Sequence, residues 1–190
     1  MIRKKNYKAI ILGGSAGSFQ VVTKILASLP KSFSIPFFLC LHRLKHVRSG
    51  FIEALSIKSV LPVIEPNDKE HIRKGNIYLA PANYHMYVEL GNIFSLSTEE
   101  PVNHSRPSID LSFFSASYAY RDKLIGIIVS GANKDGALGL KSVKNMGGLT
   151  VVQDPKECQV KTMTTAAMDI TNVDKVLSTD EIIRFLKFLA

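Results

Sequence analysis

Side chains suited to nucleophilic catalysis follow three apolar runs of the chain. Ser15 lies in a turn over Gly13–Gly17, His42 directly follows the second run, and Asp135 lies shortly after the third. A serine hydroxyl is a weak nucleophile, so it needs a base that takes its proton, and imidazole suits that role near neutral pH. A carboxylate can fix the imidazole tautomer and stabilise its charged form. Together the three residues predict acyl transfer through a covalent intermediate.

The turn around Ser15 has the pattern G-x-S-x-G. Small neighbours permit a sharp turn from strand to helix that exposes the serine oxygen. The helix behind the turn adds unpaired backbone N–H groups and the positive end of its dipole, and both suit an oxyanion. A phosphate or nucleotide site is an alternative interpretation of the same turn, although neither G-x-G-x-x-G nor G-x-x-x-x-G-K-[ST] is present. That interpretation gives no role to His42 or Asp135.

The order of the three residues separates this chain from common esterases. α/β-Hydrolases run Ser, then Asp or Glu, then His, with the serine deep inside the chain. Here the serine follows the first apolar run, and the histidine precedes the aspartate. Taken alone, His42 also fits an ordinary loop residue, and Asp135 fits a helix N-cap. Their occurrence after successive apolar runs favours the catalytic interpretation.

Short apolar runs alternate with amphipathic stretches, which is typical of a parallel sheet covered on both faces. The predicted strands are Tyr7–Leu12, Ile35–Leu41, Leu124–Val129 and Leu149–Val152. The predicted helices are Phe19–Leu29, Ser49–Ile57, Ser108–Tyr120, Asp135–Met146 and Thr179–Ala190. Between them, Tyr84–Leu90 and Ile93–Ser97 flank Gly91-Asn92, which predicts a β-hairpin with a two-residue turn.

The expected fold is therefore α/β and doubly wound, a mostly parallel sheet with helices on both faces and an inserted β-hairpin. Ligands of such sheets bind outside the carboxyl ends of the strands. Ser15, His42 and Asp135 all follow predicted strands. We expect them to meet at one edge of the sheet.

Length and composition indicate one globular domain over residues 1–190. Hydrophobic residues make up 46% of the chain and charged residues 21%, which excludes a disordered or collagen-like protein. The net charge of +8 comes from scattered cations without interleaved aromatic residues, so we expect no nucleic-acid partner. No run approaches the ~18 apolar residues of a membrane span, and the first run is too short for a signal peptide. We expect a cytoplasmic protein without membrane insertion.

Several ordered motifs extend the pattern over nearly the whole chain, from about Lys8 to the C-terminus. They are Gly13–Gly17, His42, Tyr78–Pro81 with His85-Met86, Arg106–Asp110 and Ser130–Ala137. With these motifs the chain resembles the catalytic domain of CheB, the chemoreceptor protein-glutamate methylesterase of bacterial chemotaxis. The resemblance implies hydrolysis of methyl esters on receptor glutamates with release of methanol. Some members of the family also deamidate glutamines by the same acyl-transfer chemistry.

The resemblance also implies a role for each site residue. Ser15 would be the nucleophile, His42 the general base and Asp135 the carboxylate that orients it. The oxyanion donors would be the backbone N–H groups of Ala16 and Ala132. Three further residues would bind substrate or shape the site: Arg106, His85 and Met163. No metal or organic cofactor is implied.

Departures from the family pattern leave an alternative open. Ala132 stands where the family usually has Met, Lys134 replaces Asn, and Thr164 replaces the Pro that usually follows Met163. These changes favour, as a second hypothesis, a catalytically weakened module of the same fold that binds partners. Typical members also carry a receiver domain, for which 190 residues leave no room. We expect a methylated chemoreceptor cytoplasmic region as substrate. We also expect either regulation in trans by a receiver protein or a longer parent chain.

Overall fold

The computed structural model describes residues 6–42 and 50–190. Its centre is a seven-stranded sheet of order β3-β4-β2-β1-β7-β8-β9, and every neighbouring pair in it is parallel. The strands are β1 (Ala9–Gly14), β2 (Phe37–Leu41), β3 (Val63–Ile64), β4 (Ile77–Leu79), β7 (Leu124–Ile128), β8 (Leu149–Gln153) and β9 (Lys175–Leu177). The predicted doubly wound α/β class is confirmed.

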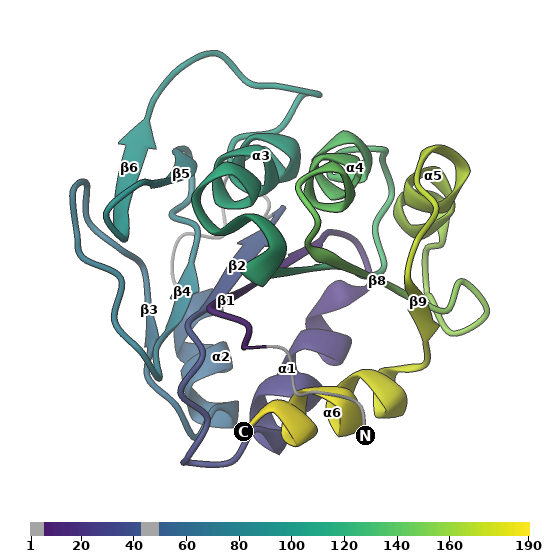
Figure 1. Cartoon of the computed structure of the whole chain (residues 1–190), viewed down its shortest axis with the longest axis horizontal. Helices are drawn as coiled ribbons and strands as arrows, with labels where there is room; N and C mark the ends of the chain where they lie inside the picture. The colour runs from purple at the N-terminus through teal and green to yellow at the C-terminus, as the bar shows by residue number, and fades with distance from the viewer. Residues whose placement is uncertain (1–5, 43–49) are drawn as a thin grey trace.

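Helices cover both faces of this sheet, as Figure 1 shows. One layer is formed by α1 (Ser18–Ser28), α2 (Phe51–Lys58) and α6 (Thr179–Leu189). The opposite layer is formed by α3 (Ile109–Tyr120), α4 (Ala137–Asn145) and α5 (Thr162–Ile170). A short 3-10 helix, η1 (Arg121–Lys123), joins α3 to β7. The two layers arise because successive side chains of a strand point to opposite faces of the sheet, so each buried strand packs against helices on both faces.

Two hydrophobic cores result from this alternation. In β1, Ile10 and Leu12 pack in the core under α1 and α6, whereas Ala9 and Ile11 pack in the core under α3 and α4. All six residues of β1 are buried, as are all five of β2 and of β7. This explains why the central strands appear in the sequence as continuous apolar runs rather than alternating ones.

The predicted hairpin is confirmed as a separate two-stranded antiparallel sheet, β5 (His85–Glu89) and β6 (Ile93–Ser97). The prediction of a two-residue turn is wrong, because Glu89 pairs with Ile93 and three residues connect them. Within this loop, Gly91 and Asn92 have φ values of 95° and 59°. Glycine and asparagine are the residues that adopt this left-handed region at least cost.

Several element boundaries differ from the prediction. β1 runs on through Gly13 and Gly14, which were expected to end it. Helix α4 begins at Ala137 because Gly136 has a φ of 95° and serves as N-cap. The predicted helix Ser49–Ile57 is α2, and its predicted first residue lies outside the described residues. Five elements were not predicted: the short strands β3, β4 and β9, the 3-10 helix η1 and helix α5.

The aromatic cluster on the α3 side of the sheet supports a stability test. The buried ring of Phe38 lies 5.4 Å from that of Phe94, edge to face, and 6.2 Å from that of Tyr78. Phe38→Ala should lower the free energy of unfolding by about 3–5 kcal/mol, because it removes contacts and leaves a cavity. Chemical denaturation measures this. Ile57→Ala is the control, since Ile57 is 81% exposed, and a comparable loss there would contradict the assignment of the core.

Candidate active site

The carboxyl ends of three adjacent strands form the site. In the sheet β1 lies between β2 and β7, with Gly14 paired to Leu41 and Gly13 paired to Ile128. Ser15 therefore leaves β1 beside the end of β2, and the N–H of His42 donates to the carbonyl of Gly14 at 3.1 Å. Asp135 reaches the same edge on the turn between β7 and α4.

The imidazole of His42 and the carboxylate of Asp135 form a direct pair. His42 Nε2 lies 2.8 Å from Asp135 Oδ2, and the side chains are 12% and 0% exposed. An ionised carboxylate only accepts hydrogen bonds, so Nε2 carries the hydrogen and the lone pair of the neutral ring is on Nδ1. Nδ1 is 3.4 Å from Asn133 Nδ2 and 3.5 Å from Ser105 Oγ. The ring thus presents Nδ1 as its basic atom.

Asp135 is held by the N-terminus of α3. Its oxygens accept from the backbone N–H groups of Ile109 at 2.7 Å and Asp110 at 3.0 Å, and from Ser108 Oγ at 3.1 Å. Burial alone would raise the pKa of Asp135, but the hydrogen bonds from His42 and these N–H groups outweigh it and lower the pKa from its usual value. The carboxylate is therefore ionised at neutral pH and fixed in direction.

The turn that carries Ser15 is hydrogen-bonded to Ser130, which follows the end of β7. The N–H of Ser15 donates to the carbonyl of Ser130 at 2.9 Å, and Ser130 Oγ lies 2.8 Å from the carbonyl oxygen of Ala16, to which it can donate. Gly17, the N-cap of α1, has a φ of 79°, and a Cβ there would lie 2.7 Å from Ser130 Oγ. Only glycine allows this close approach. Within the described residues, the Ser15 hydroxyl makes no hydrogen bond to His42.

At this edge the backbone N–H groups of Ala16 and Ala132 have no acceptor among the described residues, as is also the case for those of Gly17, Asn133 and Lys134, and both alanines are exposed. The segment before Ala132 is fixed, because the N–H of Gly131 donates to Val160 and its carbonyl accepts from Met163, both at 3.0 Å. Such preorganised donors are what an oxyanion requires. The N–H groups of Ala16 and Ala132 are those that the family resemblance implies as oxyanion donors, and this role stays a prediction.

The three residues expected to bind substrate or shape the site lie around it. His85 is fully buried, accepts from the N–H of Ser108 at 3.1 Å and donates to the carbonyl of Glu100 at 3.1 Å. Met163 is also fully buried and packs against Gly131, where a Cβ would lie 2.5 Å from the Met163 methyl carbon. Arg106 donates from one guanidinium nitrogen to the carbonyls of Thr98 and Glu99. Each of these contacts is to the protein's own loops, which corresponds to shaping the site.

Comparison with known proteins agrees with this geometry. The sequence profile of the CheB methylesterase family matches residues 10–186. The chain belongs to the CheB methylesterase family. The crystal structure of the Thermotoga maritima CheB methylesterase catalytic domain is similar with a TM-score of 0.91 and 29% identity, covering 97% of this chain and 99% of that one. The resemblance predicted from the sequence is therefore confirmed.

Relatives in the CheB family share sequence with nearly the whole chain but differ in their own length. A Leptospira interrogans protein is 44% identical over 93% of this chain and 92% of its own length. Its name is "Putative protein-glutamate methylesterase/protein-glutamine glutaminase". A Clostridium acetobutylicum protein named protein-glutamate methylesterase/protein-glutamine glutaminase is 31% identical over 99% of this chain. This chain spans 56% of the length of that relative.

The residues that support the His42–Asp135 pair, or dyad, of this CheB family member were not singled out from the sequence. Asn103, Ser108 and Asp110 surround Asp135, and Ser130 joins the nucleophile turn to the end of β7. Ser108 and Asp110 were quoted within a family motif without individual roles. Polar residues of the types Ser and Asp directly before an amphipathic helix were the available signal, and it also fits ordinary N-capping.

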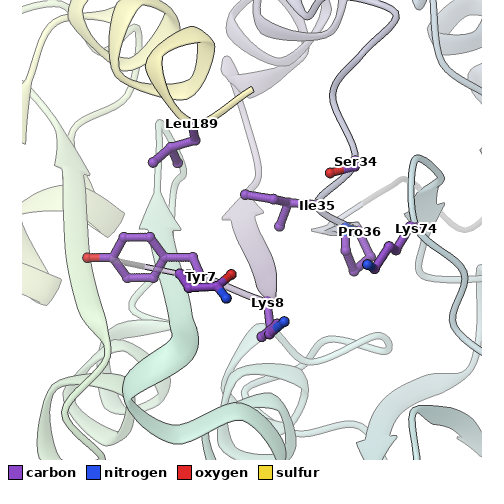
Figure 2. Close-up of a pocket in the computed structure, with 8 residues that line it drawn as sticks. Tyr7, Lys8, Ser34, Ile35, Pro36, Lys74 and Leu189 are labelled. Atoms are coloured by element: carbon purple, nitrogen blue, oxygen red, sulfur yellow. The ribbon is translucent and has the colours of Figure 1, made fainter. Parts of the chain in front are cut away.

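One cavity of the described part of the chain lies away from the strand ends that carry Ser15. It has a volume of about 270 Å³ and lies at the amino ends of β1 and β2, where Tyr7, Lys8, Ser34, Pro36 and Lys74 contribute to its lining (Figure 2). The described residues contain no group of three or more His, Cys, Asp or Glu placed to hold a metal ion. Over the same residues, no helix has the length and apolarity needed to cross a membrane.

The lowered pKa of Asp135 predicts how its contribution to stability depends on pH. The carboxylate stabilises the fold above its unfolded-state value of about 4, and this stabilisation is lost as the pH falls through the lower folded value. Asp135→Asn should therefore unfold at a lower temperature than wild type at pH 5, with a smaller difference at pH 3. Thermal unfolding at both pH values measures this. Asp169→Asn on the exposed end of α5 is the control, and a difference that grows at pH 3 would contradict the prediction.

Proposed function

We propose that this chain is a serine esterase that hydrolyses methyl esters of glutamate side chains. The observation that carries the proposal is the His42–Asp135 pair, 2.8 Å apart, at the end of the strand beside the one that leads into Ser15. The N–H groups of Ala16 and Ala132 at the same edge supply the second requirement, a site for the oxyanion.

In the proposed first step, Ser15 Oγ attacks the ester carbonyl carbon and its proton passes to His42 Nδ1. The carbonyl oxygen gains the negative charge and accepts hydrogen bonds from the N–H groups of Ala16 and Ala132. Asp135 stabilises the imidazolium through Nε2–H. The bond to the methoxy oxygen then breaks, and methanol leaves with the proton from Nδ1. Catalysis requires the Ser15 hydroxyl to come within hydrogen-bonding reach of Nδ1.

In the second step, water attacks the acyl-enzyme. His42 Nδ1 takes one proton from the water and returns it to Ser15 Oγ as the glutamic acid side chain leaves, and the acid then loses the second proton to solvent as it becomes the carboxylate. A glutamine substrate would follow the same route and release ammonia instead of methanol, and the names of the relatives give both activities. None of these steps calls for a metal ion or an organic cofactor.

The proposed substrate is the methylated cytoplasmic region of a chemoreceptor, as the family membership supports. The reaction would then take place in the cytoplasm. A receiver unit is the regulator that we propose, either as a separate protein acting in trans or as part of a longer parent chain. Several relatives are nearly twice as long as the region they share with this chain.

Ser15→Ala tests the proposed nucleophile. The substitution removes the attacking oxygen, so methanol release from a methylated chemoreceptor fragment should fall to background, while thermal unfolding stays close to that of wild type. Methanol is measured in parallel for both proteins. Release by both would remove Ser15 from the mechanism. Release by neither would favour the partner-binding hypothesis, which binding of the same fragment would then test.

Asp135→Asn tests the orienting role of the carboxylate. An amide at this position can donate to the imidazole and so favour the wrong tautomer, with Nδ1 protonated. By analogy with the serine-protease triad, kcat should fall by about 10⁴. Steady-state methanol release measures this, with Asp169→Asn as the matched control for loss of one carboxylate. A fall of less than about ten-fold would mean that Asp135 only supports the fold.

A further inference from the structure

A second buried carboxylate lies behind the His42–Asp135 pair. Asp110, in the first turn of α3, is 4% exposed. Its Oδ1 accepts from the backbone N–H groups of Gly136 at 2.8 Å and Gly139 at 2.7 Å. The N-cap of α4, Gly136, has no side chain to cap the helix, so Asp110 satisfies these donors from a different helix. The turn that carries Asp135 is thereby fixed at its C-terminal end.

The two carboxylates are linked through one amide. Asn103 Nδ2 lies 3.2 Å from Asp110 Oδ2 and 3.3 Å from Asp135 Oδ1, and it donates to both. The N–H of Asp110 itself donates to Asp135 Oδ1. Two buried carboxylates that accept from one amide are close enough for the charge of each to disfavour ionisation of the other.

We propose that Asp110 is a positioning residue whose ionised form leaves Asp135 free to serve His42, and whose protonated form donates to Asp135 and so weakens it as an acceptor. The inference rests on the proposed esterase function. It adds a second proton, besides that of the imidazole, to the pH dependence of the reaction.

The electrostatics of the pair support this assignment. Burial raises the pKa of Asp110 to about 6, the N–H groups of Gly139 and Gly136 oppose the rise, and the charge of Asp135 adds to it. Other titratable groups near this turn are His42 at the end of β2, bonded to Asp135, and His85 of β5, which reaches α3 through Ser108. Lys134 precedes Asp135 in the turn itself, and His104 follows Asn103, and both are exposed. From β1 and β7 it is Gly13 and the apolar side chain of Ile128 that lie against Ile109.

The expected pH dependence has a definite sign. Below about pH 6 Asp110 is protonated and donates a hydrogen bond to Asp135, which weakens Asp135 as an acceptor for His42. As the pH rises, Asp110 ionises, and this favours catalysis in addition to the requirement of the mechanism that the base His42 act in its neutral form. The acidic limb of kcat/KM in wild type should therefore be steeper than the loss of a single proton gives.

Asp110→Asn tests the inference. The asparagine oxygen can still accept from Gly136 and Gly139, while its amide donates toward Asp135 and so imitates the protonated acid. With p-nitrophenyl acetate as substrate, we expect kcat/KM at pH 8 to fall about ten-fold, with KM unchanged and a one-proton acidic limb. Asp169→Asn is the control and should keep the wild-type profile. A wild-type slope and rate in Asp110→Asn would overturn the inference, because a purely structural role does not change the number of protons.

A second variant and a spectroscopic measurement test the inference even if Asp110→Asn does not fold. Asn103→Ala, at an exposed position, removes the shared donor, so Asp110 should ionise at higher pH and the acidic limb should move to higher pH.

In ¹³C NMR of wild type, one aspartate carboxyl should titrate near pH 6, and in Asp135→Asn it should titrate at lower pH. This measurement needs no activity. If Ser15→Ala retains the esterase activity, the proposed function fails. If no carboxyl titrates near pH 6, the present inference fails.

Discussion

The active-site edge depends on one buried carboxylate, Asp135, which accepts hydrogen bonds from two directions. From one side comes the imidazole of His42, and from the other the first N–H groups of α3. A buried charge without partners would be costly, and here the helix N-terminus supplies donors and a favourable dipole. The same contacts that stabilise the charge also fix its direction. Stability and alignment of the dyad therefore have a common physical source.

The sheet provides the second constraint. Because β2, β1 and β7 are parallel neighbours, their carboxyl ends bring together segments that are far apart in the sequence. His42 and Asp135 are 93 residues apart, and the chain between them forms the β-hairpin and α3. His85 contributes here, since it joins the hairpin to the N-cap of α3 through Ser108. The inserted hairpin thus belongs to the support of the dyad.

The central strands, the major helices and the triad candidates could be predicted from the sequence, because buried strands leave continuous apolar runs and each run ends at a polar residue. β3 and β9 could not, since two or three residues with exposed or half-buried side chains leave no periodic signal. The hairpin loop was misjudged because Gly91-Asn92 fits a two-residue turn as well as part of a longer one. The network of Asn103, Asp110 and Gly136 depends on distances between separate elements, and these are not encoded in local spacing.

Ser130 has a consequence for how the site can vary. Its carbonyl accepts from Ser15, its hydroxyl lies within hydrogen-bonding distance of the Ala16 and Val160 carbonyls, and the N–H of Val160 donates back to it. The nucleophile turn, the strand end before Ala132 and the segment before α5 therefore behave as one mechanical unit. A substitution near Val160 would be transmitted to the spacing between the Ala16 and Ala132 amides. The distance between the two amides therefore depends on a segment between β8 and α5 that contains none of the three triad candidates.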